Sequence, residues 1–532
     1  MKCPRWFSHS KSFSHLRIAA AGSLLIAGLA IALVAAKTSS PTSTAAMNPR
    51  HKMWPLLAMG PRVTPDGAKS LTGPGYYLFG CQHGVDPFGR TCYDPFQMRH
   101  AYGVDSLIAA GYDGTGQTIV IIDAFDDPFL ADDLAAFDTI YGLPTPNFTQ
   151  IYPDGPTTFD EGWAGEMTLD VEWSHAIAPG ANIVLVHALS NSDADLLSAI
   201  KYAVDNNLGD VISMSFGEAE SCVGRFPDLQ GPDLTAAYHD VFAEATQKGI
   251  TLLAGSGDQG ASQPTCDVNS WIKSASAPAN DPLVTAVGGT ELHATGYPSN
   301  CTDTTLPGCS ASSISPRPGT YQGEIAWNEG PPYGDFQDTP PLLGKTFATG
   351  GGFSVIFDQP PYQRATLPNG MGRGVPDVAY NAAIFHGVLI QFLTDFPFGG
   401  TFVAGGTSAG SPQWAALTAI TNQKAGHRLG FLNSAIYQIG RVNKAYPASF
   451  HDIVSGNNSA VEFDSMNNPV NIVGFSAGNG WDPTTGLGSP IEGSIADNLI
   501  KYVSPGDGQA AIATSKPKPH PRPVVPGHMN PH

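Results

Sequence analysis

The stretch EGWAGEMTLDVEWSHAIAPGANIVLVHA, residues 161–188, joins a helical pattern to an apolar run rich in β-branched residues. Residues 161–177 carry the helical pattern, and residues 181–188 are typical of a strand buried in a parallel sheet. Comparable apolar runs lie at 117–124, 210–217, 251–257 and 282–289, and further helical patterns lie at 192–207 and 233–248. Because strands and helices alternate, we predict an α/β fold whose parallel sheet is flanked by helices on both faces.

The composition is that of an acidic, loop-rich globular chain. It has 532 residues, enough to bury a large core, with 60 Gly, 45 Pro and a formal net charge of −19. This charge argues against nucleic acid as a partner, because phosphate binding needs a basic surface. The excess of acids also agrees with work at low pH, where protonation of carboxylates reduces self-repulsion.

The two ends of the chain differ in composition from its middle. Residues 1–36 begin with a basic stretch and continue as an apolar run, which predicts a signal peptide or an uncleaved anchor. Residues 37–92 are expected to be a linker or short pro-region, and residues 504–532 a Pro-rich disordered tail. Between about 295 and 400 we expect Gly/Pro-rich loops. We therefore expect a secreted protein with no stable membrane association unless the signal stays uncleaved.

Six cysteines remain after the signal region, an even number that argues for disulfides in an exported chain. Sequence alone leaves their connectivity open. Proximity along the chain favours the pairs Cys81–Cys92, Cys222–Cys266 and Cys301–Cys309.

A turn of small residues in VAGGTSAGSPQWAAL (403–417) delivers Ser408 at the start of an apolar helix. Backbone N–H groups and the helix dipole favour developing negative charge at such a position. A serine hydroxyl is a weak nucleophile, so Ser408 needs a base. Of the 15 histidines, His175 and His187 are the best placed. A lone histidine is nevertheless more often a structural residue than a catalyst.

Two carboxylates offer another base. Glu166 and Asp170 lie four residues apart in the helical pattern, so they project from one face and can touch. Close carboxylates share a proton, and apolar neighbours indicate a buried helix, so one pKa should rise. The other interpretation, a solvated acidic helix face, is the commoner meaning of this spacing. Ser408, together with Asp258 in AGSGDQG (254–260), favours the catalytic interpretation.

Three segments resemble the signature segments of the sedolisins, the serine-carboxyl peptidases: GGTSAGSP (405–412), GEMTLDVEWSHAIAPGA (165–181) and LLAGSGDQGA (252–261). The resemblance extends over residues 93–503 and implies a sedolisin-type peptidase domain with a subtilisin-like fold. It implies Ser408 as the nucleophile, Glu166 as its general base and Asp170 as the support of Glu166. It also implies that Asp258 is an oxyanion-hole acid, which must be protonated to donate a hydrogen bond.

The C-terminal stretches FHDI (450–453) and AGNGWDPTTGLGSP (477–490) also resemble the family and imply one structural Ca²⁺ in this loop region. The resemblance implies as ligands the carboxylates of Asp452 and Asp482 and the carbonyls of Ile453, Gly478 and Gly480. Glycine loops leave carbonyls free to turn toward such a hard cation. Without the resemblance, two aspartates in turns would not indicate a metal.

Several positions depart from the family pattern. Gly405 stands where a serine is more frequent, but Ser408 is intact. Phe216 and Asp123 stand where kumamolisin-like members carry a tryptophan and a glutamate that extend the acid network. We expect these changes to alter the pH dependence without abolishing activity. Family members also usually carry a long inhibitory prodomain, whereas only residues 37–92 lie between the predicted signal and the region of resemblance.

Residues and resemblance together predict a secreted, acid-active serine-carboxyl peptidase acting through an acyl-enzyme on Ser408, with an optimum at roughly pH 3–5. We expect protein or peptide substrates, endopeptidase rather than tripeptidyl-peptidase action, and a monomer. One alternative is a neutral subtilisin-like enzyme that uses Asp123, a histidine and Ser408. The other is a non-catalytic protein on the same scaffold.

Overall fold

The computed structural model describes residues 53–63, 79–83, 90–224, 233–298, 314–330, 346–392 and 400–518. The predicted export segment and the pair Cys301–Cys309 lie outside the described residues. The other two predicted disulfides, Cys81–Cys92 and Cys222–Cys266, are confirmed, with Cα–Cα distances of 5.2 and 5.3 Å. Within the described ranges, no helix combines the length and the apolar character needed to cross a bilayer.

The centre of the fold is an eight-stranded sheet with the order β14–β13–β9–β7–β4–β6–β5, in which β17 also pairs with β13. Its strands are β4 (Thr118–Ala124), β5 (Asn147–Ile151), β6 (Asn182–Ala188), β7 (Val211–Met214), β9 (Thr251–Gly255), β13 (Thr285–Ala294), β14 (Tyr321–Ala326) and β17 (Val378–Asn381). Every pairing is parallel except that of β13 with β14. The predicted parallel sheet is confirmed, and five of its strands coincide with predicted apolar runs, whereas β5 was not predicted.

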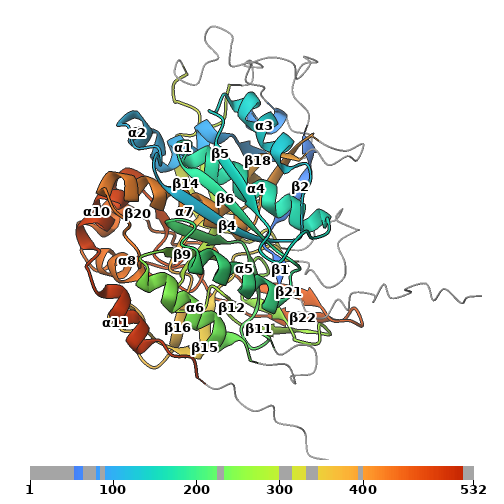
Figure 1. The fold of residues 1–532 in the computed structure, drawn as a ribbon, viewed down its shortest axis with the longest axis vertical. Helices are drawn as coiled ribbons and strands as arrows, with labels where there is room; N and C mark the ends of the chain where they lie inside the picture. Colours follow the sequence, from blue (N-terminus) through green and yellow to red (C-terminus); the bar gives the residue numbers. More distant parts are fainter. Residues whose placement is uncertain are drawn as a thin grey trace, which may run out of the picture. The chain divides into compact units, whose positions relative to one another are not determined.

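Helices pack on this sheet in two pairs. α4 (Glu161–Ile177) and α7 (Thr407–Ala425) contact each other and β4. α5 (Asp193–Asp205) and α6 (Thr235–Gln247) form the second pair, and Figure 1 shows them in front of the sheet. The remaining helices are α1 (Pro95–Tyr102), α2 (Val104–Ala109), α3 (Leu130–Tyr141), α8 (Asn433–Gly440), α9 (Tyr446–Ser449), α10 (Glu492–Tyr502), α11 (Asp507–Thr514) and the 3-10 helix η1 (Gly80–Gln82).

A second sheet has the order β2–β19–β18–β3. Its strands are β2 (Ala58–Val63), β3 (Thr91–Tyr93), β18 (His386–Phe392) and β19 (Gly400–Gly405). The expectation of loops between about 295 and 400 is therefore wrong where β14, β15 (Gly352–Asp358), β16 (Gly372–Val375), β17 and β18 form. β14 and β17 pair with β13, and β18 pairs with β3 as well as with the neighbouring β19, so tertiary packing fixes these strands more than local pattern does.

Several small ladders complete the strand pairing: β1 (Trp54–Pro55) and β12 (Ser276–Ala277) with β8 (Phe216–Ala219), β10 (Ser262–Pro264) with β11 (Trp271–Lys273), β15 with β16, β20 (Phe450–His451) with β23 (Ser489–Pro490), and β21 (Ala460–Phe463) with β22 (Pro469–Ile472). The range 37–92, expected to be a linker or pro-region, thus supplies β1, β2 and β3. In the range 504–532, α11 packs on α6 and buries Ala511. The structure differs there from the expected disordered tail, because an apolar side chain finds a partner surface.

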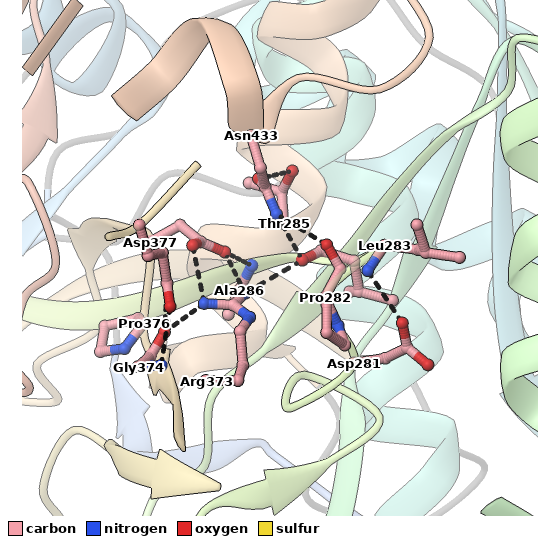
Figure 2. Close-up of polar contacts among 12 residues, drawn as sticks. Asp281, Pro282, Leu283, Thr285, Ala286, Arg373, Gly374, Pro376, Asp377 and Asn433 are labelled. Atoms are coloured by element: carbon pink, nitrogen blue, oxygen red, sulfur yellow. Dashed lines mark hydrogen bonds and ion pairs between the residues drawn. The ribbon is translucent and has the colours of Figure 1, made fainter. Parts of the chain in front are cut away.

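A buried ion pair connects β16 to the start of β17 (Figure 2). Arg373 Nη1 and Nη2 donate to Asp377 Oδ1 and Oδ2 at 2.8 and 2.5 Å, and both side chains are fully buried. Asp377 also accepts hydrogen bonds from Ala286 N at 2.8 Å and Tyr437 OH at 2.9 Å. Burial alone would lower the pKa of Arg373, but Asp377 raises it, so the guanidinium stays charged.

Candidate active site

Ser408 is the second residue of α7 and is buried at the N-terminus of that helix. The turn before it requires two glycines. Gly406 has φ +94°, and a Cβ added there would lie 2.1 Å from Leu56 O. A Cβ added at Gly405 would lie 2.4 Å from a backbone oxygen. Gly405 stands where the family more often has a serine, and the lack of room for a Cβ explains the glycine.

Three carboxyl groups lie buried beside this turn. Glu166 and Asp170 are one helical turn apart on α4, and Asp123 lies near the end of β4. Burial raises the pKa of all three well above its usual value. For Glu166, burial makes the largest contribution to the raised pKa. Asp170 and Asp123 raise the pKa of Glu166 further, and the Ser408 side chain lowers it. The cluster therefore holds protons that exposed carboxylates would lose.

Ser215 connects the carboxyl cluster to the nucleophile. Its Oγ donates to Asp170 Oδ1 at 2.9 Å, and its carbonyl oxygen accepts a hydrogen bond from Ser408 Oγ at 3.4 Å. Within the described ranges, neither oxygen of Glu166 or of Asp123 has a hydrogen-bond partner of normal geometry. Sequence reasoning missed Ser215. Its position directly before the noted Phe216 is the signal that could have found it.

Phe216 limits how far this network extends. Its ring packs on Trp163, with 6.1 Å between the ring centroids, and it has no N–H group to donate. Asp123 lies within electrostatic reach of Asp170. Phe216 follows Ser215, which contacts Asp170, so both positions that depart from the family pattern lie beside the acid cluster.

Asp258 lies in the loop after β9 and is held by the residue before the nucleophile. Thr407 N and Thr407 Oγ1 both donate to Asp258 Oδ1 at 2.8 Å. Burial raises the pKa of Asp258 to about 7, although the Thr407 hydrogen bonds lower it. Because Oδ1 already accepts two hydrogen bonds, the proton belongs on Oδ2, which is buried and lacks a partner within the described residues. A protonated Asp258 can therefore donate a hydrogen bond from Oδ2.

A stretch of the chain's own N-terminal region lies across this site. Ser408 N donates to Leu56 O at 3.3 Å, and Leu56 N donates to Ser215 O at 3.1 Å. Leu56 is only 2% exposed. Sequence reasoning placed this stretch in the linker or pro-region, and no local motif marks it as part of the site.

The two histidines considered as bases have structural partners instead. His187 Nδ1 lies 2.8 Å from Phe125 O, and its Nε2 lies 3.0 Å from Gln150 Oε1. His175 Nε2 lies 2.7 Å from Pro144 O. Burial also lowers the pKa of His187, which favours its neutral form. These contacts direct both rings away from the role of a base for Ser408.

Two of the predicted calcium ligands, the carboxylates of Asp452 and Asp482, contact the same glycine loop at the C-terminal end of the fold. Asp452 accepts hydrogen bonds from Gly480 N at 3.0 and 3.1 Å, and Asp482 accepts one from Gly478 N at 3.1 Å. Ile453 follows Asp452 and is buried. Two carboxylates that contact one glycine loop are hard oxygen donors of the kind that Ca²⁺ binds. The residues present therefore fit the ion in their chemistry.

The arrangement around Ser408 suits acyl transfer. A hydroxyl lies at a helix N-terminus, a buried carboxyl lies beside it, and a second acid, whose pKa is raised to about 7 so that it is protonated in acid, lies at the same turn. The hydroxyl can act as the nucleophile and the buried carboxyl as the base. The second acid can donate a hydrogen bond to the oxyanion that forms.

Comparison with known proteins agrees with this geometry. Residues 162–427 match the model of the subtilase family. The chain is 36% identical over 432 residues to kumamolisin of Bacillus sp. (strain MN-32), which covers 78% of this chain and 65% of kumamolisin. It is 30% identical over 368 residues to sedolisin of Pseudomonas sp. (strain 101), which covers 67% of this chain and 53% of sedolisin.

A solved structure extends the comparison to three dimensions. Pseudomonas sedolisin, a serine-carboxyl proteinase complexed with two molecules of pseudo-iodotyrostatin, superposes with a TM-score of 0.60 at 28% identity. The superposition covers 78% of this chain and 100% of that one, which confirms the subtilisin-like fold. The matched regions span less than two thirds of the full length of kumamolisin and of sedolisin. The chain belongs to the subtilase family and, within it, is a sedolisin-type, kumamolisin-like protein.

Proposed function

We propose that this protein is a serine-carboxyl peptidase that hydrolyses peptide bonds through an acyl-enzyme on Ser408. The observation that carries the proposal is the meeting of Ser408, Glu166 and Asp258 at the N-terminus of α7. Ionised Glu166 takes the Ser408 proton as Oγ attacks the substrate carbonyl carbon, and it then returns the proton to the leaving amine. Water attacks the resulting ester by the same route and releases the acid.

Asp258 and the Ser408 amide stabilise the oxyanion in this mechanism. The donor at Asp258 exists only while Oδ2 is protonated, and the pKa of about 7 makes that the main form in acid. Glu166 must be ionised at the same time, so the first proton lost by the coupled cluster sets the rising limb of activity. We therefore propose that the enzyme works on the acid side of pH 7.

We propose endopeptidase rather than tripeptidyl-peptidase action on proteins or peptides. The chain's own residues Met53–Val63 pass through the site, with main chain on both sides of Leu56. A cleft that holds an internal stretch in this way can accept an internal stretch of a substrate. A neutral subtilisin-like enzyme is not favoured, because the candidate histidines contact other groups. The non-catalytic alternative is not favoured either, because Ser408, Glu166 and Asp258 stand together.

We propose that one structural Ca²⁺ binds between Asp452 and Asp482, with carbonyls of Ile453, Gly478 and Gly480. The ion would neutralise two carboxylates and hold the C-terminal loop beside β20. We also propose that the protein is exported and monomeric and does not bind nucleic acid, as its net charge of −19 favours.

A pH–rate profile on a peptide library tests the function, with product masses that distinguish internal cleavage from release of tripeptides. We expect a maximum below about pH 7, set on its alkaline side by Asp258. The Ser408→Ala variant should show only background cleavage at every pH. A maximum above that pH, or equal cleavage by Ser408→Ala, would contradict the proposed roles.

A further inference from the structure

Three side chains that the proposed reaction does not use lie together where β13 meets β18. Glu291 and His293 are two residues apart on β13 and therefore lie on one face of the sheet, and His386 is the first residue of β18. Glu291 and His293 are partly exposed, whereas Leu292 between them is buried on the other face. One strand thus presents a carboxylate and an imidazole side by side, and the other strand adds a second imidazole.

The spacing of these groups is that of ligands around one small ion. Glu291 Oε1 lies 3.3 Å from His293 Nε2 and 3.1 Å from His386 Nδ1. Ligand atoms that are bound at about 2.0–2.1 Å to a tetrahedral ion lie about 3.4 Å from one another. One ligand atom of each residue lies within 4.8 Å of the others. Only a small movement is therefore needed to bring all three donors to an ion.

The buried nitrogen of His386 distinguishes this cluster from an ordinary ion pair. His386 Nδ1 is shielded from solvent and has no hydrogen-bond partner of normal geometry within the described residues, although Glu291 Oε1 is only 3.1 Å away. A ring N–H that served only to pair with the carboxylate would point at that oxygen. A buried polar atom without a partner is costly. An ion held between the nitrogen and the oxygen would remove that cost.

Hydrogen bonds fix the two strands that carry the ligands. Asn381 Oδ1 accepts a hydrogen bond from Leu292 N at 3.0 Å, and Asn381 Nδ2 donates to His386 O at 2.7 Å. Glu329 Oε1 accepts a hydrogen bond at 2.6 Å from Phe385 N, directly before His386. The ligands on β13 and the ligand on β18 are thus positioned by backbone that is already in place, as a preorganised site requires.

We propose that Glu291, His293 and His386 bind one divalent transition-metal ion of the Zn²⁺ class. Two imidazoles and one carboxylate are a donor set that Zn²⁺ accepts, whereas Ca²⁺ and Mg²⁺ prefer oxygen ligands alone. The side chain of His293 is 42% exposed, so the ion can enter from solvent. Water would complete the coordination on that exposed side.

The ion would stabilise the backbone that carries the nucleophile turn. Thr290 O, directly before Glu291, accepts a hydrogen bond from Ala382 N at 2.8 Å, and Ala382 O accepts one from Gly406 N at 2.7 Å. The ion would tie the residue after Thr290 to His386, four residues beyond Ala382. It would therefore link β13 to β18 on both sides of this connection and raise the stability of the folded state.

Calorimetric titration of the full-length Ser408→Ala protein with ZnCl₂ tests the site. The variant cannot digest itself by the proposed reaction, and excess CaCl₂ keeps Zn²⁺ from the proposed calcium site. Near neutral pH, where the ligands can lose their protons, we expect one equivalent to bind and Tm to rise. His386→Gln in this parent should weaken the binding at least about tenfold. The exposed His427→Gln is the matched control and should bind as the parent does.

Glu291→Gln gives a second, spectroscopic comparison. With Co²⁺ in place of Zn²⁺, the parent should show the visible absorption of a four-coordinate ion, and Glu291→Gln should lose most of it. Equal affinity in His386→Gln and its parent, or no binding to a parent that is folded by circular dichroism, would overturn the site. Both readouts are independent of catalysis, so the metal site and the proposed peptidase function can fail separately.

Discussion

Two buried clusters of charged residues in this molecule differ in how their charges are compensated. Asp377 lies against the guanidinium of Arg373 and accepts further hydrogen bonds from a main-chain amide and a tyrosine (Figure 2). Glu166 and Asp123 are equally buried but have no hydrogen-bond partner of normal geometry within the described residues. The first cluster can stay charged, whereas burial favours the protonated forms of the second.

The difference shows which buried acids are available for chemistry. A carboxylate committed to an arginine and an amide holds strands together, and removing its partner leaves an uncompensated charge. A carboxyl group with free oxygens and a raised pKa can exchange a proton with a neighbouring hydroxyl. Substitutions in the two clusters should therefore act on different quantities, the free energy of unfolding in one and turnover in the other.

Glu166→Gln should give the largest effect. The amide cannot accept the Ser408 proton, so kcat for peptide hydrolysis should fall by about 10³-fold or more, while Tm at neutral pH stays equal or rises because a buried acid is removed. Steady-state kinetics and thermal unfolding measure the two. Glu161→Gln, exposed at the first residue of the same helix, is the control. Near-normal turnover in Glu166→Gln would contradict the role of Glu166 as the general base.

Arg373→Met should act in the opposite sense. It leaves Asp377 buried without its cation, which should lower the free energy of unfolding by about 3–5 kcal/mol, whereas kcat per folded molecule should change little. Denaturant unfolding and active-site titration measure these quantities. The double variant Arg373→Met with Asp377→Leu should recover part of the loss. An unchanged unfolding midpoint in the single variant would show that the paired cluster contributes no stability.

Removal of calcium with EGTA should have the next largest effect, which is a loss of stability in the C-terminal loop. An ion present at about 100 times its Kd stabilises the fold by about 3 kcal/mol, so Tm should fall by several degrees on chelation and recover with added Ca²⁺. Asp452→Asn should abolish the response, and Asp240→Asn on the exposed face of α6 should keep it. An EGTA response that survives in Asp452→Asn would place the ion elsewhere.

Asp258→Asn should give the smallest change at the optimum and a clear change in pH dependence. In the wild type the folded pKa of about 7 lies above the usual 3.8, so folded Asp258 keeps its proton until pH rises through about 7. Activity should follow that loss, and the stability linked to the raised pKa should fall as pH rises from 3.8 to about 7. The Asn side chain donates at any pH, so the alkaline limb should move upward. An unchanged limb would assign it to another group.

Much of the fold could be predicted because local pattern and tertiary structure agree along β4, β6, β7, β9 and β13. Their apolar runs mark strands covered on both faces. β5 is half exposed and had no clear local signal, whereas β18, which pairs with the neighbouring β19 and with distant Thr91–Tyr93, was missed within a region rich in Gly and Pro. The turn of small residues at Gly405 and Gly406 before a helix could be predicted from the sequence, but its steric reason lies in backbone that only the fold brings near.

The site shows the same division. The candidate residues Ser408, Glu166, Asp170 and Asp258 could be identified from the sequence. Glu166 and Asp170 have the spacing of one helix face, and Ser408 and Asp258 each lie just after a strand. The contacts of Ser408 with Ser215 O and Leu56 O could not be identified, since main-chain groups carry no side-chain signature. The chain crossing its own cleft was likewise invisible in a stretch that reads as a linker.

The sequence by itself determined which chemical groups are present and which of them share a helix face or a strand end, because those relations depend on the regular geometry of the backbone. Only the tertiary structure decided how deeply the carboxyl groups are buried and which of them find a partner, and those two facts set their pKa values. It also decided that a main-chain carbonyl of residue 56 meets the amide of Ser408. Such a contact depends on how distant segments pack, and no local pattern of side chains encodes it.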